Sequence, residues 1–501
     1  MEIAFDNKHI GIYREISHQI KRVQETAESV VPDTNDDIGK IASVQTSVLL
    51  KSKDVTSRGV LITGELAAAL IYITEDEKAV SSVRLSKPFT LEYDLPDADA
   101  DALAHINLAI QNSESRVINP RKVSVTFELF GELSLYRQET AAAETTLPEN
   151  APEGLHVQCE ETELITACAV MEKTFAVNEQ FPFPPGKPKP AQLVAQNVDF
   201  ALSETQVIGT KAVIKGSVNI ALCYLSSEVN YPVRAEFTTP FSQIIDTAEE
   251  NTDHCGVIVQ PTSVYCALAD TINGDKALDA ELHAVLQLVC HRKETVKYIS
   301  DAYSNLMPSS FTAQTRQLAA VSAVTAARLT ADERVTVVED CEDVLSVFTS
   351  VSQVSVLPDK LSAAVTLDIV YRTTGGTLSA VRRLVGVENT PGVTQARLMS
   401  ARLADVYLRP DGASIDAHIS VELSYQTGSV AEITSVERVT LDDQSPYDTA
   451  AFPALTLVLA EQETLWQLAK TYHSSVERIK QLNPPEPEGE CARLMLIPKA
   501  L

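Results

Sequence analysis

Three stretches of the chain share one pattern, and this pattern decides the fold: GELAAALIYITED from Gly64, GSVNIALCYLSSE from Gly216 and AAVTLDIVYRTTG from Ala363. They align on a tyrosine, which is Tyr72, Tyr224 and Tyr371 in turn. A glycine lies eight residues before the tyrosine in the first two stretches, and an alanine takes its place in the third. Self-similarity of this kind indicates that one structural unit is repeated along the chain.

Further matches extend each copy downstream. A Pro-Phe step follows the tyrosine by sixteen residues in the first two copies, at Pro88-Phe89 and Pro240-Phe241, whereas the third copy has Val387-Glu388 there and is the divergent one. A second alternating run comes later in every copy: KVSVTFELFGELSLY from Lys122, KALDAELHAVLQLVC from Lys276 and ASIDAHISVELSYQ from Ala413.

Apolar side chains at every second position bury one face of a strand and leave the other in water. We therefore predict a mainly β protein with minor α, built of three tandem antiparallel β-rich modules and not of parallel, doubly wound sheets. Short helices are predicted at Asp36–Val44 and Pro188–Gln196, and Leu318–Leu329 is ambiguous between helix and strand. Thr374–Thr377 (TGGT) is predicted to be a hairpin turn.

Composition sets the module boundaries. Ala141–Gly154 is rich in Ala, Pro and acidic residues without periodicity, which is typical of a linker, and Leu441–Pro453 has a similar character. The predicted domains are residues 1–140, 155–300, 308–440 and 454–501.

The charge of the chain excludes several partners. Its 501 residues include 68 acidic and 41 basic side chains, for a formal net charge of -27. Such a field repels nucleic acid and anionic membrane surfaces. The N-terminal segment has no basic and apolar signal pattern, and no apolar stretch is long enough to span a bilayer, so we expect a cytoplasmic protein.

The eight cysteines include no CxxC pair, and several lie inside apolar runs. Buried thiols that act as small hydrophobic side chains explain them better than a disulfide framework or a metal site. The acidic segment 94–103 lacks the spacing and the glycine of a calcium loop, and we expect it to be a solvated loop. No metal or other cofactor is predicted.

Residues 455–501 form a distinct unit. A short strand at 455–459 precedes Thr464 and Gln467, which have the spacing of a helix capping box. A second box is predicted from Ser474 and Glu477, and Pro484 and Pro485 are expected to end the second helix. The strand LMLIP closes a β-α-α-β order.

This unit resembles a LysM domain through three elements: TLWQLAKTY, the Asn483-Pro484 step and Leu496-Ile497-Pro498. The resemblance implies a groove between two loops that takes N-acetylglucosamine glycans. It places six candidate partner- or glycan-binding residues there: Glu463, Thr464, Gln467, Asn483, Pro484 and Pro485. The family's Gly-Asp is Gln462-Glu463 here, and the second loop carries an acidic insert, PPEPEGE.

Repeats of this type followed by one LysM-like unit are similar to the SipL-like family of SPOCS-domain proteins from endospore-forming Firmicutes. The resemblance implies a non-enzymatic scaffold of spore coat assembly in the mother-cell cytoplasm, at the forespore surface. It also implies that the LysM unit binds the ATPase of the coat basement layer. The acidity of the chain and its altered glycan loops agree with a protein partner.

No catalytic motif accompanies these patterns. The chain has no GxSxG, HExxH, GxxxxGK[ST] or GxGxxG, and its His-Cys neighbours, His254-Cys255 and Cys290-His291, point to opposite faces if they lie in strands. Two alternatives to the scaffold stay open, a peptidoglycan- or glycan-binding protein of the spore envelope and a hydrolase with an unrecognised site. Trp466, the one tryptophan, packs against the terminal strand or faces a partner.

Overall fold

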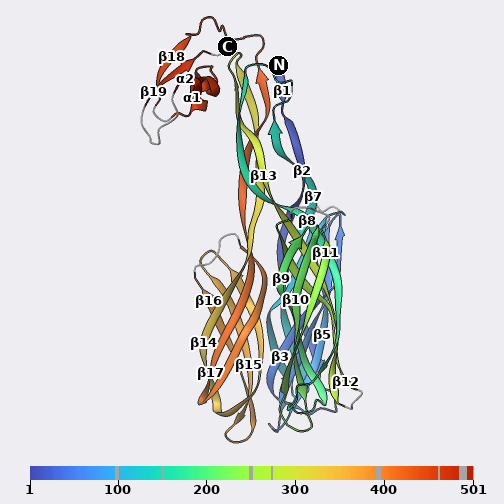
Figure 1. Cartoon of the computed structure of the whole chain (residues 1–501). Helices are drawn as coiled ribbons and strands as arrows, with labels where there is room; N and C mark the ends of the chain where they lie inside the picture. The colour runs from blue at the N-terminus through green and yellow to red at the C-terminus, as the bar shows by residue number, and fades with distance from the viewer. Residues whose placement is uncertain are drawn as a thin grey trace.

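A computed structural model describes residues 1–95, 101–148, 150–247, 252–271, 275–390, 396–460, 463–483 and 493–499 (Figure 1). The chain is mainly β, as the alternating pattern predicts, and every strand pair printed for these residues is antiparallel. No helix in this part of the chain has the length and apolar character needed to cross a bilayer. The elements are β1 (Glu2–Ala4), β2 (Asp6–Val30), β3 (Ile38–Thr56), β4 (Gly59–Thr74), β5 (Val80–Asp94), β6 (Leu103–Asn119), β7 (Lys122–Thr146), β8 (Leu155–Pro182), β9 (Gln192–Ile208), β10 (Lys211–Leu225), β11 (Val233–Asp246), β12 (His254–Asp270), β13 (Lys276–Ser304), β14 (Ser309–Val356), β15 (Leu361–Thr373), β16 (Leu378–Asn389), β17 (Ala396–Leu441), β18 (Leu455–Ala460), α1 (Leu465–Thr471), α2 (Val476–Leu482) and β19 (Arg493–Pro498).

The strands form three β-sandwiches. In the first, sheet β3-β4-β5 faces sheet β2-β7-β6, and in the second, sheet β9-β10-β11 faces sheet β8-β13-β12. The third uses β14 to β17 in one continuous sheet, because β14 and β17 are long enough to contribute to both layers. Each sandwich encloses its own hydrophobic core.

Strict alternation explains why the three downstream runs are strands. In β7, residues 123, 125, 127 and 129 are fully buried while their neighbours face outward. Residues 278 to 288 of β13 and 415 to 423 of β17 repeat this pattern at every second position. Removing that apolar surface from water stabilises the sandwiches by about 25 cal/mol per Å².

The three aligned tyrosines are buried at equivalent places on β4, β10 and β15. The Tyr72 hydroxyl donates to the carbonyl of Asp36 over 2.9 Å, and the Tyr224 hydroxyl donates to the carbonyl of Pro188 over 2.8 Å. Both acceptors precede their tyrosine by 36 residues. Tyr72 therefore ties the loop before β3 to the central strand β4, and Tyr224 ties the loop before β9 to the central strand β10.

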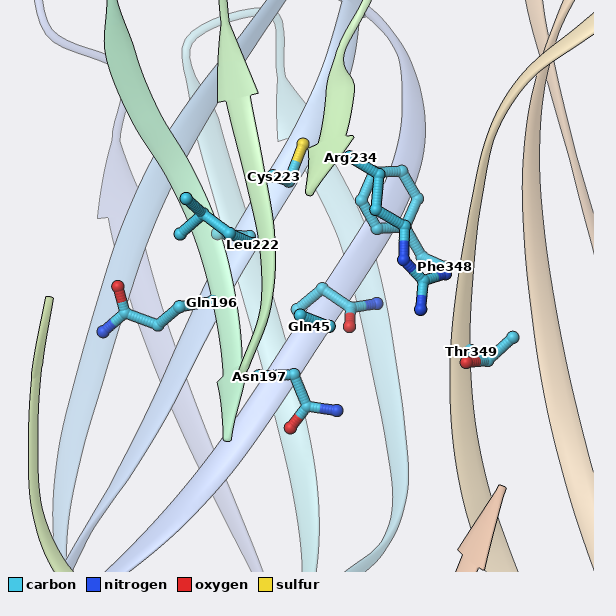
Figure 2. A pocket seen from close by; sticks show the side chains of 10 residues that line it. Gln45, Gln196, Asn197, Leu222, Cys223, Arg234, Phe348 and Thr349 are labelled. Carbon is cyan, nitrogen blue, oxygen red and sulfur yellow. The ribbon is translucent and has the colours of Figure 1, made fainter. Parts of the chain in front are cut away.

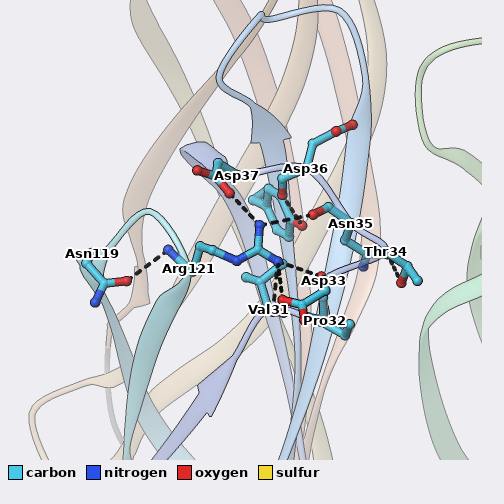
Figure 3. A network of polar contacts seen from close by, with 10 residues as sticks. Val31, Pro32, Asp33, Thr34, Asn35, Asp36, Asp37, Asn119 and Arg121 are labelled. Carbon is cyan, nitrogen blue, oxygen red and sulfur yellow. Dashed lines mark hydrogen bonds and ion pairs between the residues drawn. The ribbon is translucent and has the colours of Figure 1, made fainter.

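Arg121 holds this loop from the other side in the first sandwich (Figure 3). Its guanidinium donates to Asp37 Oδ1 over 2.6 Å and to the carbonyl of Pro32 over 2.9 Å. Because a guanidinium presents five donors in one plane, a single side chain satisfies several acceptors of the crossover between β2 and β3. The crossover that Tyr72 ties is thus fixed at both ends.

Side chains of one sandwich cover the open edge of another. Gln287 of β13 donates to the carbonyl of Ile106 and accepts from its amide, both over 2.7 Å, and Gln260 of β12 accepts from the Leu108 amide over 3.0 Å. Lys53 of β3 bonds the carbonyl of Ala104 within the first sandwich and Glu172 of β8 across the same boundary. These contacts satisfy backbone groups of edge strand β6 that would otherwise need a further strand.

The three sandwiches also share one apolar cluster. Ile71, Cys223 and Val370, which each precede an aligned tyrosine by one position, are buried together there. The remaining buried members come from all three sandwiches: Ala42, Ile73, Val80, Val194, Ala195, Phe348, Leu378 and Ala380. The outward faces of the three central strands are therefore buried against one another.

A stem leaves the second and third sandwiches and carries the C-terminal unit at its tip (Figure 1). It contains the far ends of β8 and β13, the far ends of β14 and β17, and β1, and the paired ends of β2 and β7 run beside these strands. Its own apolar cluster joins Ile3 and Phe5 with Ile299, Val436 and Val439.

Several sequence-based predictions are wrong at the level of single elements. The predicted helices at Asp36–Val44 and Pro188–Gln196 contain the starts of strands β3 and β9. Leu318–Leu329, which the sequence left open between helix and strand, lies in strand β14. The predicted linker Ala141–Gly154 is strand as far as Thr146, which pairs with Asp6. Pairing with a neighbouring strand outweighs local helix preference in each case. The turn at Thr374–Thr377 is confirmed, and Gly376 has a φ of 84° there.

The prediction that the cysteines are all thiols is also wrong. Cys255 and Cys290 lie opposite each other on β12 and β13 and form a disulfide. Cys223 is a buried thiol, as expected from its apolar run, and Cys341 is a buried thiol as well. Cys491 and half of the acidic segment 94–103, residues 96–100, lie outside the described residues.

Candidate binding site in the C-terminal unit

The C-terminal unit has the order β18-α1-α2-β19, with β18 and β19 paired antiparallel. Its small core contains five of its own buried apolar side chains besides Ala460, namely Leu468, Ala469, Ile479, Met495 and Ile497. Tyr303, from the end of β13, also belongs to this core and is only 3% exposed. The stem thus completes the core of the unit that it carries.

Tyr303 is bonded as well as buried. Its hydroxyl donates to the carbonyl of Ser474 over 2.8 Å, and its ring stacks on His156 of β8. Burial raises the pKa of Tyr303 well above its usual value, with a smaller contribution from the carboxylates of Glu477 and Asp301. The residue therefore stays neutral and keeps donating across the physiological pH range.

Trp466 packs on the stem. Its indole meets the Tyr303 ring edge-on at 4.9 Å, and its Nε1–H donates to Asp301 Oδ2 over 2.8 Å. Lys470, one turn later, bonds both oxygens of Asp301 over 2.7 and 2.8 Å. Trp466 is thus half-buried and packed, with contacts to a strand 165 residues away that the sequence did not predict. We call Asp301, Tyr303, Trp466 and Lys470 the stem contact.

The first predicted capping box is confirmed. Thr464 Oγ1 accepts from the Gln467 amide over 3.2 Å, and Gln467 Oε1 accepts from the Thr464 amide over 2.8 Å. The second box is wrong, because Ser475 and not Ser474 caps α2. Ser474 is fully buried, and its hydroxyl donates to the carbonyl of Pro498 over 2.5 Å, which fastens the loop to β19.

The structure brings only part of the predicted groove together. Glu463, Thr464 and Gln467 are exposed side by side at the start of α1. Asn483 is half-buried and binds its own unit: its amide nitrogen donates to the carbonyls of Ile479 and Leu496, and its oxygen accepts from the Leu496 amide. The two proline candidates, Pro484 and Pro485, lie outside the described residues.

These bonds limit the chemistry of the groove. A sugar is recognised through polar groups that are not already satisfied within the protein. Asn483 has both amide hydrogens and its oxygen engaged in holding α2 to β19. Its role is therefore to shape the unit.

The face of the β18-β19 sheet that points away from the two helices is apolar and exposed. Leu455, Leu457 and Leu459 of β18 are 48%, 61% and 57% exposed, and Leu494 of β19 is 66% exposed. The two helices cover the other face of this sheet, on the side of the stem (Figure 1). We call these four leucines the leucine face. Exposed apolar side chains gathered in this way mark surfaces that bind other macromolecules.

Sequence reasoning missed both the stem contact and the leucine face. The leucine face has a visible signal, since LTLVLA alternates, but alternation alone does not say which set of side chains faces inward. Asp301 and Tyr303 give no signal in the sequence, because their partners lie in a different unit.

Concave regions occur between the sandwiches in the described part of the chain. A pocket of about 30 Å³ lies where all three meet, lined by Gln45, Gln196, Cys223, Arg234 and Phe348 among others (Figure 2). A space of this volume holds a water molecule and not a substrate. Arg234 spans the boundary there, with Nη1 donating to the carbonyl of Val347 over 2.7 Å.

The larger cavity, of about 1530 Å³, lies between strands of all three sandwiches. Two ion pairs lie in its lining: Arg397 bonds Glu132 over 2.9 Å, and Arg402 pairs with Glu422. In the part of the chain that the structure describes, no three His, Cys, Asp or Glu residues are arranged to hold a metal. The cysteines of the two His-Cys neighbours are bonded to each other, so neither is a thiol nucleophile in this state.

Comparison with known proteins bears on the first sandwich. Its strands β3 to β6, with the crossover residue before them, form one continuous segment of two layers. Residues 37–118 match the SPOCS domain of SipL. The SPOCS segment therefore begins at Asp37, which Arg121 holds, and ends just before the hairpin that leads into β7. No curated protein and no solved structure matches the chain.

Proposed function

We propose that this protein is a non-enzymatic scaffold of endospore coat assembly. The SPOCS match at residues 37–118 is the observation that carries the link to sporulation. The second and third sandwiches are two further SPOCS-like repeats in this proposal, within the predicted boundaries 155–300 and 308–440. The matching tyrosine bonds and the common strand order support that assignment for the second sandwich, and the buried Tyr371 at the equivalent place supports it for the third.

The C-terminal unit, residues 454–501, is a LysM-like binding module in this proposal. Its β-α-α-β order and its Thr464 capping box support the assignment. The partner is a protein, the ATPase of the coat basement layer, and the place of action is the mother-cell cytoplasm at the forespore surface. The leucine face supports a protein partner, because apolar side chains give an interface its affinity whereas glycans require polar groups.

The test is a binding assay with full-length protein and the purified ATPase. Replacing Leu457 by Arg places a charge in the centre of the leucine face, and we expect binding to fall at least tenfold. Leu384→Arg is the matched control, because Leu384 on β16 is 52% exposed but lies in the third sandwich. Equal binding by both variants would refute the leucine face as the site.

A parallel assay with insoluble peptidoglycan separates the glycan-binding alternative. Under the proposal, neither the wild type nor Thr464→Ala sediments with the polymer. Sedimentation of the wild type that is lost in Thr464→Ala would favour the glycan function and overturn the protein-partner proposal.

A further inference from the structure

Three cysteines lie in one row across the second sandwich. Strand β13 runs between β12 and β8, and its Cys290 faces Cys255 on one side. On the other side Cys290 faces Ala169, while the next residue, His291, already faces Ala167. The register therefore slips by one residue at this point, and Cys168 is the extra residue of a bulge directly beside Cys290.

The three sulfur atoms share one buried environment. Cys168, Cys255 and Cys290 are 4%, 5% and 0% exposed and belong to the same hydrophobic core. The disulfide joins Cys255 to Cys290, and Cys168 is not disulfide-bonded. The Cys168 thiol donates to the carbonyl of Cys290 over 3.3 Å, which holds it against the residue whose sulfur is already bonded.

We propose that this row is a thiol–disulfide exchange site in which Cys290 bonds alternately to Cys255 and to Cys168. The Cys168 thiol loses its proton, and its sulfur attacks Sγ of Cys290. The bond between Cys290 and Cys255 breaks, its electron pair stays on Cys255, and Cys255 takes up a proton. One disulfide and one thiol are present before and after, so the step needs no external oxidant or reductant.

The position of the row gives the exchange a structural consequence. Strand β12 begins at His254, and from Arg292 onward β13 pairs only with β8 as the two strands run into the stem. The Cys255–Cys290 bond fastens the edge strand of the sandwich. The Cys168–Cys290 bond would instead fasten the two strands at the base of the stem.

The first test maps the disulfides of the full-length protein. Wild-type protein is refolded from urea in a glutathione redox buffer, quenched with acid, alkylated and digested without reduction. We expect mass spectrometry to find two linked peptides that share Cys290, one with Cys255 and one with Cys168. Finding the Cys255–Cys290 link alone would overturn the proposal.

A variant isolates the second state. In Cys255→Ser, refolded in the same buffer with glutathione disulfide as the oxidant, we expect the Cys168–Cys290 link to form. Cys223→Ser is the matched control, because Cys223 is buried in the other sheet of the same sandwich, and it should leave the wild-type mixture unchanged. A Cys255→Ser protein with native circular dichroism and two unlinked thiols would refute the exchange.

Discussion

At the residue scale, the repeated glycine and phenylalanine form a matched pair. Gly64 lies opposite Phe89 and Gly216 lies opposite Phe241 in the strand register. A Cβ on Gly216 would overlap the carbonyl oxygen of Ala201 and lie 2.6 Å from the Phe241 ring. The glycine is therefore required because the ring packs flat over the backbone, and the positions were predictable from the repeat although their contact was not.

The divergent third copy follows the same steric rule. Ala363 replaces the glycine and lies opposite Val387, and both are buried. A smaller partner side chain leaves room for the added methyl group. In the third copy the larger alanine is thus matched by a valine that is smaller than phenylalanine, and the fold is kept.

Gly216→Ala should consequently destabilise the protein by about 1–3 kcal/mol, because the new methyl group has no space. The urea midpoint of unfolding measures this change. Gly386→Ala, at an exposed strand position where a Cβ would meet nothing within 4 Å, is the control and should have a small effect. Equal midpoints for the two variants would contradict the packing argument.

His105 makes stability depend on pH. Burial, and then the nearby cations Lys53 and Arg397, lower the pKa of His105 to about 3. The unfolded chain takes up this proton near pH 6.5 and the folded chain does not, so stability is lost as the pH falls below that value, by up to about 1.4 kcal/mol per unit.

Unfolding by urea at pH values from 7.5 to 5.0 measures this slope. His105→Gln should flatten it, since the variant has no imidazole to protonate in the unfolded state. His283→Gln removes an exposed imidazole and should leave the slope as in the wild type. A slope that is unchanged in His105→Gln would show that other groups cause the pH dependence.

At the element scale, alternation identified the strands of the central runs but failed where a strand begins with a mixed pattern. Residues 36–44 hold apolar side chains at 38, 41, 42 and 44, a spacing that also matches a helical face. Bulges in the pairing of β3 with β4 change which side chains face inward, and three register shifts occur between these strands. A regular period therefore could not be read from this segment.

The hydrogen bonds from Gln287 to the edge strand β6 could not be predicted from the sequence, because donor and acceptor are 181 residues apart. Gln287→Leu removes both bonds to Ile106 and leaves its amide and carbonyl buried without partners. We expect a loss of about 1–3 kcal/mol and faster hydrogen exchange in β6 than in β4. The exposed Gln206→Leu is the control, and unchanged exchange in β6 would argue against the capping role.

At the scale of the whole molecule, the stem contact decides whether the C-terminal unit moves independently. The sequence predicted a separate unit behind a linker, since nothing in residues 441–501 points to β13. Asp301 and Tyr303 nevertheless bond Trp466, Lys470 and Ser474. The unit is held against the stem by ionic, aromatic and hydrogen-bonding contacts together.

The single tryptophan reports on this contact. Asp301→Ala removes the acceptor of the Trp466 indole and the ion pair with Lys470, and we expect the tryptophan emission to shift to longer wavelength as the ring meets water. The cost is about 1–3 kcal/mol for bonds to a charged group. Asp405→Ala, at an exposed site on β17, should leave the spectrum unchanged. An unshifted spectrum in Asp301→Ala would mean that other contacts hold the unit.

The cluster of Ile71, Cys223 and Val370 has a consequence for assembly. The same face of all three sandwiches is buried in this cluster, so it is not available to a fourth body from another molecule. Neighbouring molecules therefore cannot associate by continuing the sandwich-to-sandwich contact. Growth into a larger layer must use other surfaces, such as the leucine face at the far end of the stem.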